Sequence, residues 1–188
     1  MSFWAKSAKG TPLAVRMIRS FARTTWLSEA RKIELYFPFL FMRVKVVHLD
    51  RDWRRVVLKL PLTSLSRNAN GVLFGGFQAM LADPVAALAC ARRFREHACF
   101  TRAMTIDFER AGDSDLELKF EFTEADEAKI AKELKETGRS TPVFTYGFYN
   151  ARNELVSKIT NTVAIRPVGY VKKPDRSASP ADPETFGH

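Results

Sequence analysis

Two glycines and a carboxylate lie within one apolar segment of this chain. Gly75 and Gly76 open a segment that is predicted as a single helix over residues 75–96, and Asp83 lies inside it. The first N–H groups of a helix have no internal partner and lie at the positive end of its dipole. Because glycine has no Cβ, a carbonyl can approach them closely and its oxyanion can be stabilised there. The alternative is an ordinary helix start that happens to contain glycine.

Asp83 allows two interpretations. A carboxylate in apolar surroundings must be hydrogen-bonded, paired or used, and it can serve as a general base or nucleophile whose pKa is tuned by burial. It is followed by Pro84, and an Asp-Pro pair is also a favourable cap and first turn that would restart the helix after a kink. Residue chemistry alone slightly favours the cap.

Alternating segments surround this helix in the sequence. Apolar and polar residues alternate with a period of two, which is typical of antiparallel strands with one covered face. The segments are 42–46, 56–60, 104–108, 116–122, 144–148 and 155–165. Thr123 and Asp126 predict the cap of a short charged helix that stops near Gly138. We expect an α+β fold in which an antiparallel sheet of about six strands wraps around the long apolar helix.

The same patterns divide the chain into three parts. Residues 1–36 are predicted as an amphipathic helical extension whose apolar face continues to Phe37, residues 37–167 as the domain, and residues 168–188 as a disordered tail rich in proline. Packing of the extension on the domain is favoured over docking on a membrane surface. Its basic side chains on one face are Arg16, Arg19 and Arg23.

Composition excludes several classes of protein. The chain has 188 residues, of which 46% are hydrophobic and 27% charged, as in one soluble globular domain. No stretch approaches the roughly 18 apolar residues of a membrane span, so we expect a cytoplasmic protein. Two cysteines are too few for a disulfide scaffold, and the three histidines are scattered, so no metal site is predicted. Cys90 is expected to pack as a small apolar residue rather than act as a nucleophile.

The net charge of +9 is unevenly distributed. Residues 1–110 carry a surplus of +11, whereas residues 111–138 carry −5. Such a field attracts polyanions, which include nucleic acid, anionic lipid and phosphorylated cofactors. No nucleic-acid-binding motif accompanies the charge, so that partner is disfavoured.

The segment from Arg67 to Pro84, RNANGVLFGGFQAMLADP, and a later strand beginning MTIDFERAG resemble the hotdog-fold thioesterases. The similarity is greatest to the phenylacetate-pathway type and to a related hotdog family of unknown function with a Leu/Met-Ala-Asp-Pro helix. It covers about residues 36–166, and its specific parts are Asn68, Gly75, Gly76, Leu81, Ala82, Asp83, Thr105, Ile106, Asp107, Phe108 and Gly112. The resemblance implies a hotdog fold and acyl-CoA substrates, without a metal and without a cofactor besides the coenzyme A of the substrate. It also implies a homodimer, or a dimer of dimers, with sheets joined edge to edge and a shared active site.

The resemblance also implies roles for individual residues. The N–H of Gly75 would polarise the thioester carbonyl, and Asp83 would activate water or attack directly. Gly76 and Phe74 would lie against the substrate, and Asn68 would position substrate or water, unless it is an ordinary loop residue.

Two differences from relatives bear on activity. The family usually has histidine immediately before the two glycines, where this chain has Phe74. That difference implies an altered substrate preference, weak activity or none. Related hotdog dehydratases need a catalytic histidine, and neither His48 nor His97 has a comparable setting, so dehydration is disfavoured.

Arginines near the helix could bind the phosphates of coenzyme A through charge-assisted hydrogen bonds, although they suit a solvated surface equally well. The candidates are Arg92, Arg93 and Arg102. The sequence therefore predicts an acyl-CoA thioesterase that uses Gly75 and Asp83. The alternative is a non-catalytic protein that binds acyl-CoA or lipid and associates with membrane through the basic N-terminal helix.

Overall fold

The computed structural model describes residues 27–170. Its elements, in chain order, are α2 (Glu29–Leu35), α3 (Phe37–Phe41), β1 (Lys45–Leu49), β2 (Arg55–Leu60), α4 (Gly75–Arg93), β3 (His97–Phe108), β4 (Leu116–Glu121), α5 (Glu124–Thr137), β5 (Val143–Tyr149) and β6 (Leu155–Pro167). The predicted basic face of the N-terminal helix (Arg16, Arg19 and Arg23) and residues 171–188 of the predicted tail lie outside the described residues.

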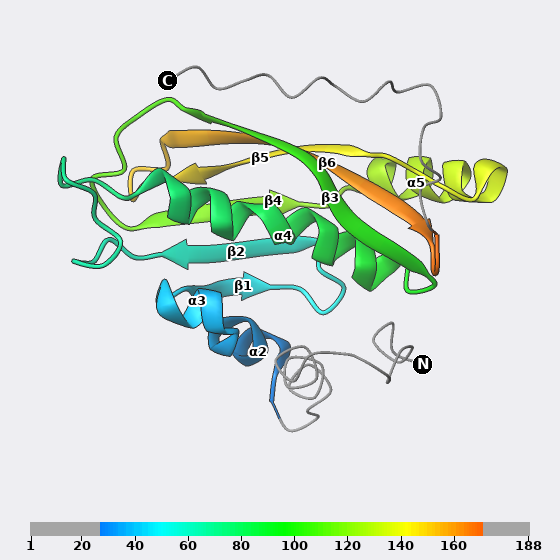
Figure 1. Ribbon diagram of the computed structural model, residues 1–188, viewed down its shortest axis with the longest axis horizontal. Helices are drawn as coiled ribbons and strands as arrows, with labels where there is room; N and C mark the ends of the chain where they lie inside the picture. The colour runs from blue at the N-terminus through cyan, green and yellow to red at the C-terminus, as the bar shows by residue number, and fades with distance from the viewer. Residues whose placement is uncertain (1–26, 171–188) are drawn as a thin grey trace, which may run out of the picture.

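The strands form one antiparallel sheet in the order β1-β2-β4-β5-β6-β3 (Figure 1). The expected alternation is present: in β4, Leu116, Leu118 and Phe120 are buried, whereas the residues between them are partly exposed. Apolar side chains on this face meet α4, and together they form the core. The predicted sheet around a long apolar helix is confirmed.

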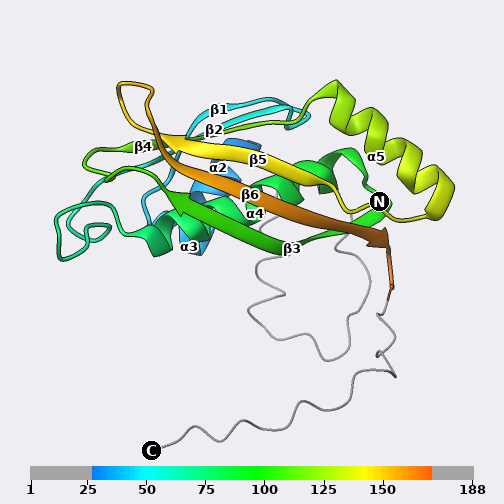
Figure 2. The same cartoon turned by 90° about the horizontal axis from the view of Figure 1, so that it is seen from above.

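Helix α4 runs along one face of the sheet, and β5, β6 and β3 pass over it in Figure 2. It is continuous from Gly75 to Arg93, so the interpretation of Asp83 and Pro84 as a cap that restarts the helix is wrong. Pro84 has no N–H to donate to the carbonyl of Met80, one turn earlier. Because Met80 lies on an exposed part of the helix, solvent can satisfy that carbonyl.

The sequence predicted that the helical extension continues to Phe37, but the helix ends before that residue. The backbone leaves the helical region at Tyr36 (φ −61°, ψ 123°), and α3 begins at the next residue with proline in its first turn. Pro38 causes this break, because it could not donate to the carbonyl of Glu34 but is tolerated at a helix start. Ile33 is buried and the Glu34 carboxylate accepts a hydrogen bond from the N–H of Val46 at 3.1 Å, so α2, the described part of the predicted extension, packs on the domain.

Strand β3 is longer than predicted and forms one edge of the sheet. It begins at His97 rather than near residue 104, and among the described strands it pairs only with β6 (Figure 2). The register shifts between Thr101 and Ala103, which leaves Arg102 at an exposed bulge. Within residues 27–170, its outer edge therefore has N–H and C=O groups without a partner strand over much of its length.

Helix α5 begins and ends where the sequence predicts. The Thr123 hydroxyl accepts from the N–H of Asp126 at 3.1 Å, the Asp126 carboxylate accepts from the N–H of Thr123, and Gly138 closes the helix at φ 70°.

In residues 27–170, no helix is both long and apolar enough to cross a membrane.

Candidate active site

Two backbone N–H donors at the N-terminus of α4 have no acceptor among the described residues. The carbonyl of Phe74 accepts the first hydrogen bonds of the helix, from the N–H of Phe77 at 3.0 Å and of Gln78 at 3.4 Å. The N–H groups of Gly75 and Gly76 precede these donors and have no acceptor within the helix. They are the groups that the sequence predicted to receive a carbonyl oxygen.

Aromatic rings flank both glycines. A Cβ added at Gly75 would lie 2.7 Å from Cζ of Phe108, the last residue of β3, and a Cβ at Gly76 would collide with the ring of Phe74. Both rings are about half-exposed. Phe74 also meets Phe77 edge-on at 5.9 Å. The absence of side chains at the two glycines therefore lets these rings lie against the start of α4.

The loop before α4 is held by backbone hydrogen bonds. The N–H of Leu73 donates to the carbonyl of Gly112 at 2.8 Å, which links the start of α4 to the segment after β3. Within the loop, Oδ1 of Asn68 accepts from the N–H of Asn70 at 2.9 Å and of Val72 at 3.2 Å. Asn68 therefore stabilises a turn. Its role toward substrate or water stays a prediction.

Asp83 lies on the exposed side of α4 and not in the dry surroundings that the sequence suggested. Gly76, Met80 and Asp83 follow one another at helical spacing along this side, and all three are exposed. In the part of the chain described here, no group donates a hydrogen bond to the Asp83 carboxylate. At about 1.5 Å per residue, Asp83 lies roughly 12 Å along the helix from Gly75. A carbonyl held at Gly75 is therefore out of reach of the Asp83 carboxylate in the same chain.

Three side chains from three strands hold the backbone of α4 at Asp83. The hydroxyl of Thr101 in β3 and Nδ2 of Asn161 in β6 donate to the carbonyl of Asp83 at 2.8 and 3.1 Å. The hydroxyl of Tyr146 in β5 donates to the carbonyl of Ala82 at 2.7 Å and accepts from Asn161 Nδ2 at 3.0 Å. Asn161 is fully buried and Tyr146 nearly so. We call Thr101, Tyr146 and Asn161 the carbonyl clamp, because it fixes where the helix presents Asp83.

The family of the chain follows from its sequence profile. A family described as "Domain of unknown function (DUF4442)" matches residues 26–165. The chain belongs to this DUF4442 family. No curated protein matches the sequence significantly.

Solved structures with the same architecture include three bacterial proteins. One, from Pseudomonas aeruginosa, is described as a protein of unknown function and probable thioesterase; it has 15% identity, a TM-score of 0.66 and coverage of 73% of this chain and 93% of its own. A putative thioesterase from Shewanella oneidensis has 10% identity, a TM-score of 0.58 and coverage of 81% and 96%. A thioesterase from Haemophilus influenzae has 14% identity, a TM-score of 0.55 and coverage of 70% and 83%. The DUF4442 chain therefore has the hotdog fold that its sequence predicted.

Two of the three predicted arginines in this DUF4442 chain lie far from the glycines. Arg92 and Arg93 end α4, roughly 27 Å from Gly75 along the helix axis. Arg92 pairs with Glu29, and Arg93 pairs with Asp52 at 3.0 Å and with a second carboxylate. Both side chains are therefore engaged in ion pairs, and their contact with coenzyme A stays a prediction.

Arg102 is better placed. It follows Thr101, whose bond to the Asp83 carbonyl brings this part of β3 to the level of Asp83. Its side chain is exposed at the bulge, and no acidic side chain within residues 27–170 pairs with it. Of the predicted phosphate-binding arginines, Arg102 is the one that follows a residue bonded to the backbone at Asp83.

Sequence patterns did not identify the clamp residues or a second buried polar pair. The Ser157 hydroxyl donates to Oε1 of Gln78 at 2.6 Å, one helical turn after the glycines, and both residues are buried. Ser157 and Asn161 occupy inward positions of β6, one on each side of Ile159. A polar residue at an inward position of an alternating strand was the available signal.

Removal of the Tyr146 hydroxyl is expected to impair the clamp. Tyr146→Phe leaves Asn161 Nδ2 and the carbonyl of Ala82 without one partner, so we expect about 1–2 kcal/mol lower stability by denaturant unfolding. If the clamp positions Asp83, kcat for thioester hydrolysis should also fall, with KM nearly unchanged. Ser157→Ala, which removes another buried hydroxyl that bonds α4 from β6, is the control that should affect stability alone.

The two cysteines are not activated nucleophiles. Cys90 is fully buried in the core, and burial raises the pKa of its thiol; burial also raises the pKa of Cys99 to about 12. We therefore expect iodoacetamide at neutral pH to leave the native protein unmodified by mass spectrometry and thioester hydrolysis unchanged. Rapid loss of activity on alkylation would contradict this.

Within residues 27–170, no three His, Cys, Asp or Glu side chains lie close enough together to hold a metal ion.

Proposed function

We propose that this hotdog protein hydrolyses acyl thioesters of coenzyme A at a site built by two copies of the chain. The observation that carries the proposal is the arrangement of α4, in which free N–H groups and an exposed carboxylate share one exposed side of the helix. The N–H groups suit binding of the thioester oxygen, and the carboxylate suits activation of water. Their separation of roughly 12 Å prevents them from acting together within one chain.

A second copy removes this difficulty. If two α4 helices lie antiparallel with their exposed sides together, the glycines of one helix meet Asp83 of the partner subunit, and the reverse holds at the other end. The free edge of β3 supports this arrangement, because edge-to-edge pairing of two β3 strands would bring the adjacent α4 helices together. A dimer of dimers is the larger assembly that the family resemblance implies.

The proposed chemistry uses only groups of the protein and water. The N–H of Gly75 binds the thioester oxygen, and the Asp83 carboxylate of the partner takes a proton from water as the water oxygen bonds to the acyl carbon. When the carbon–sulfur bond breaks, the thiolate leaves with the proton, giving a carboxylic acid and free coenzyme A. Direct attack by Asp83 would instead form an anhydride that water then hydrolyses.

Substrate contacts follow from the same geometry. The rings of Phe74, Phe77 and Phe108 offer apolar surface for an acyl or aryl group next to the carbonyl site. Arg102 is the proposed phosphate contact, since the preceding residue, Thr101, bonds the backbone of Asp83, which in an antiparallel pair would lie near the glycines of the partner. A cytoplasmic location remains a prediction, consistent with the location of coenzyme A.

Release of free thiol from a panel of acyl-CoA substrates tests the proposal. The panel should contain short, medium and long aliphatic chains together with phenylacetyl and benzoyl groups. We expect release that scales with enzyme concentration and depends on Asp83. Absence of release for every substrate at high enzyme concentration would refute hydrolysis.

One observation favours a second function, which is acyl-CoA binding without catalysis. The ring of Phe74 lies against Gly76, at the position where the family usually has histidine. This alternative predicts saturable binding of acyl-CoA, measured by calorimetry, with no thiol release. Phe74→His would then be expected to retain binding and to gain measurable hydrolysis.

A further inference from the structure

A cluster of large apolar side chains is exposed around α3. Phe37 is 76% exposed, although it begins a helix whose Phe39 is buried in the core. The cluster, called here the α3 surface, consists of Leu35, Tyr36, Phe37, Leu40 and Phe41. Contiguous apolar groups of this kind on a protein exterior mark an interaction site more often than single exposed residues do.

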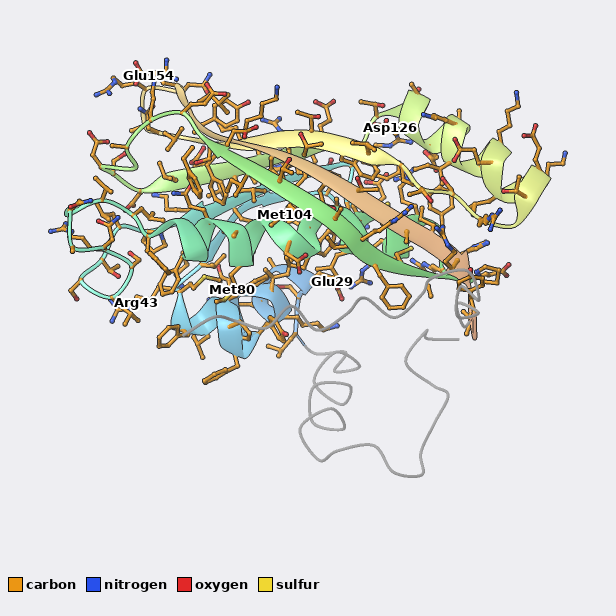
Figure 3. All side chains as sticks on the ribbon, turned by 45° about the horizontal axis from the view of Figure 1, so that its top comes forward. Glu29, Arg43, Met80, Met104, Asp126 and Glu154 are labelled. Atoms are coloured by element: carbon orange, nitrogen blue, oxygen red, sulfur yellow. The ribbon has the colours of Figure 1, made fainter. Side chains whose placement is uncertain are left out.

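Basic side chains border the α3 surface. Arg31, Arg43 and Lys45 line a hollow of about 250 Å³ together with Leu35 and Leu40. Figure 3 labels Arg43 beside α3. The hollow therefore combines cationic and apolar walls.

One carboxylate also lines the hollow, but it does not balance the charge. Glu34 pairs with Arg31 at 3.0 Å and with Lys45 at 4.0 Å, and it accepts the N–H of Val46. Arg43 has no acidic partner within residues 27–170. Three cations against one anion leave the border positive.

We propose that the α3 surface docks on a bilayer that contains anionic phospholipid. Phe37 and Leu40 would enter the boundary between headgroups and acyl chains, and Arg31, Arg43 and Lys45 would contact lipid phosphates. Apolar side chains inserted beside basic ones are the arrangement by which short amphipathic segments bind such surfaces.

Charge selects a bilayer over a second copy of the chain. The sequence that precedes α2 is also basic: residues 1–26 contain five Lys or Arg and no Asp or Glu. Two such surfaces facing each other would bring like charges together, whereas an anionic bilayer complements both the charge and the apolar side chains. The proposal does not depend on the proposed hydrolysis.

Co-sedimentation of the full chain with vesicles tests the proposal. We expect binding to vesicles of phosphatidylcholine and phosphatidylglycerol in equal parts, and weak binding to phosphatidylcholine alone. The variant with Phe37→Ser and Leu40→Ser should bind at least about tenfold more weakly, because two inserted side chains are lost. Arg43→Gln should weaken binding to the anionic vesicles by about fivefold, near the 1 kcal/mol expected of one basic residue at the surface.

Matched controls lie elsewhere on the chain. Val143→Ser removes a side chain that is 57% exposed on β5, and Arg139→Gln removes an exposed cation after α5. Neither change should alter vesicle binding, and circular dichroism would verify that every variant is folded. Hydrolysis of short-chain acyl-CoA in solution, if present, should be equal in parent and variants.

Three outcomes would overturn the proposal. The first is equal binding to neutral and anionic vesicles. The second is full binding by the Phe37 and Leu40 variant, combined with loss of binding when Arg16, Arg19 and Arg23 are changed to Gln. The third is no vesicle binding by the parent together with a smaller oligomer in the Phe37 and Leu40 variant, which would identify the α3 surface as an interface between copies.

Discussion

Asp83→Asn is expected to lower kcat for thioester hydrolysis by a factor of about 10²–10⁴, because the amide can neither accept the proton of water nor attack the acyl carbon. The side chain is exposed and receives no hydrogen bond from residues 27–170, so the free energy of unfolding should change by less than about 0.5 kcal/mol. Steady-state thiol release and denaturant unfolding measure the two effects. Glu136→Gln, the same chemical change at an exposed position of α5, is the control.

Mixed dimers give a sharper test of the shared site. Asp83→Asn and Gly75→Val should each be inactive alone, the second because its side chain would meet the ring of Phe108 beside the carbonyl site. A mixed dimer would contain one intact pair of Gly75 and Asp83. Random mixing should therefore restore about a quarter of the parental activity. Full activity of Asp83→Asn alone would show that Asp83 is structural, and absence of restoration would show that each site lies within one chain.

Arg93→Met is expected to cause the largest loss of stability. The Arg93 side chain is only 9% exposed, lies over the ring of Phe122 at 5.3 Å and pairs with Asp52 and Glu127. Its removal breaks the ion pairs that join the β1–β2 turn, α4 and α5, although Asp52 and Glu127 keep Arg54 as a partner. Because both carboxylates are partly exposed and keep that partner, we expect a cost of about 2 kcal/mol, below that of a broken buried pair, and a Tm lower by roughly 4–8 °C.

The pH dependence of this variant provides an independent check. The hydrogen bond from Arg93 holds the pKa of Asp52 below its usual value. A lowered pKa in the folded protein contributes stability that is present above the unfolded value near 3.8 and is lost as the pH falls through the folded value. The stability of the parent should therefore fall more steeply below pH 4 than that of Arg93→Met. Arg139→Met, at an exposed position, should change neither Tm nor this slope.

The sequence predicted the parts of the fold that depend on local periodicity. Alternation in β4 and the apolar run of α4 indicated elements that the structure contains, because each buries one face against the same core. The break at Tyr36 was missed because the apolar spacing continues through Phe37 although Pro38 cannot complete the backbone hydrogen bonds. The first half of β3 was missed because an edge strand with an exposed bulge at Arg102 shows little alternation.

Candidate chemistry was predictable only where it depends on neighbours in the chain. The glycines and Asp83 lie on one helix, so the number of residues between them was enough to predict the distance between them along the helix axis. The clamp could not be predicted, since Thr101, Tyr146 and Asn161 come from three strands and meet only through the sheet order. For the same reason, the ion pairs that occupy Arg93 depend on residues 41 and 34 positions away.

The sheet order has a consequence for the synthesis of the chain. Among the strands of residues 27–170, β6 is the last to emerge from the ribosome, yet it lies between β5 and β3 and supplies Asn161 to the clamp. Until residues 155–167 are available, β3 has no partner strand and the two parts of the sheet are unconnected. Fragments that end before β6 should consequently not reach a native state, and nascent chains should depend on protection by chaperones until β6 has emerged.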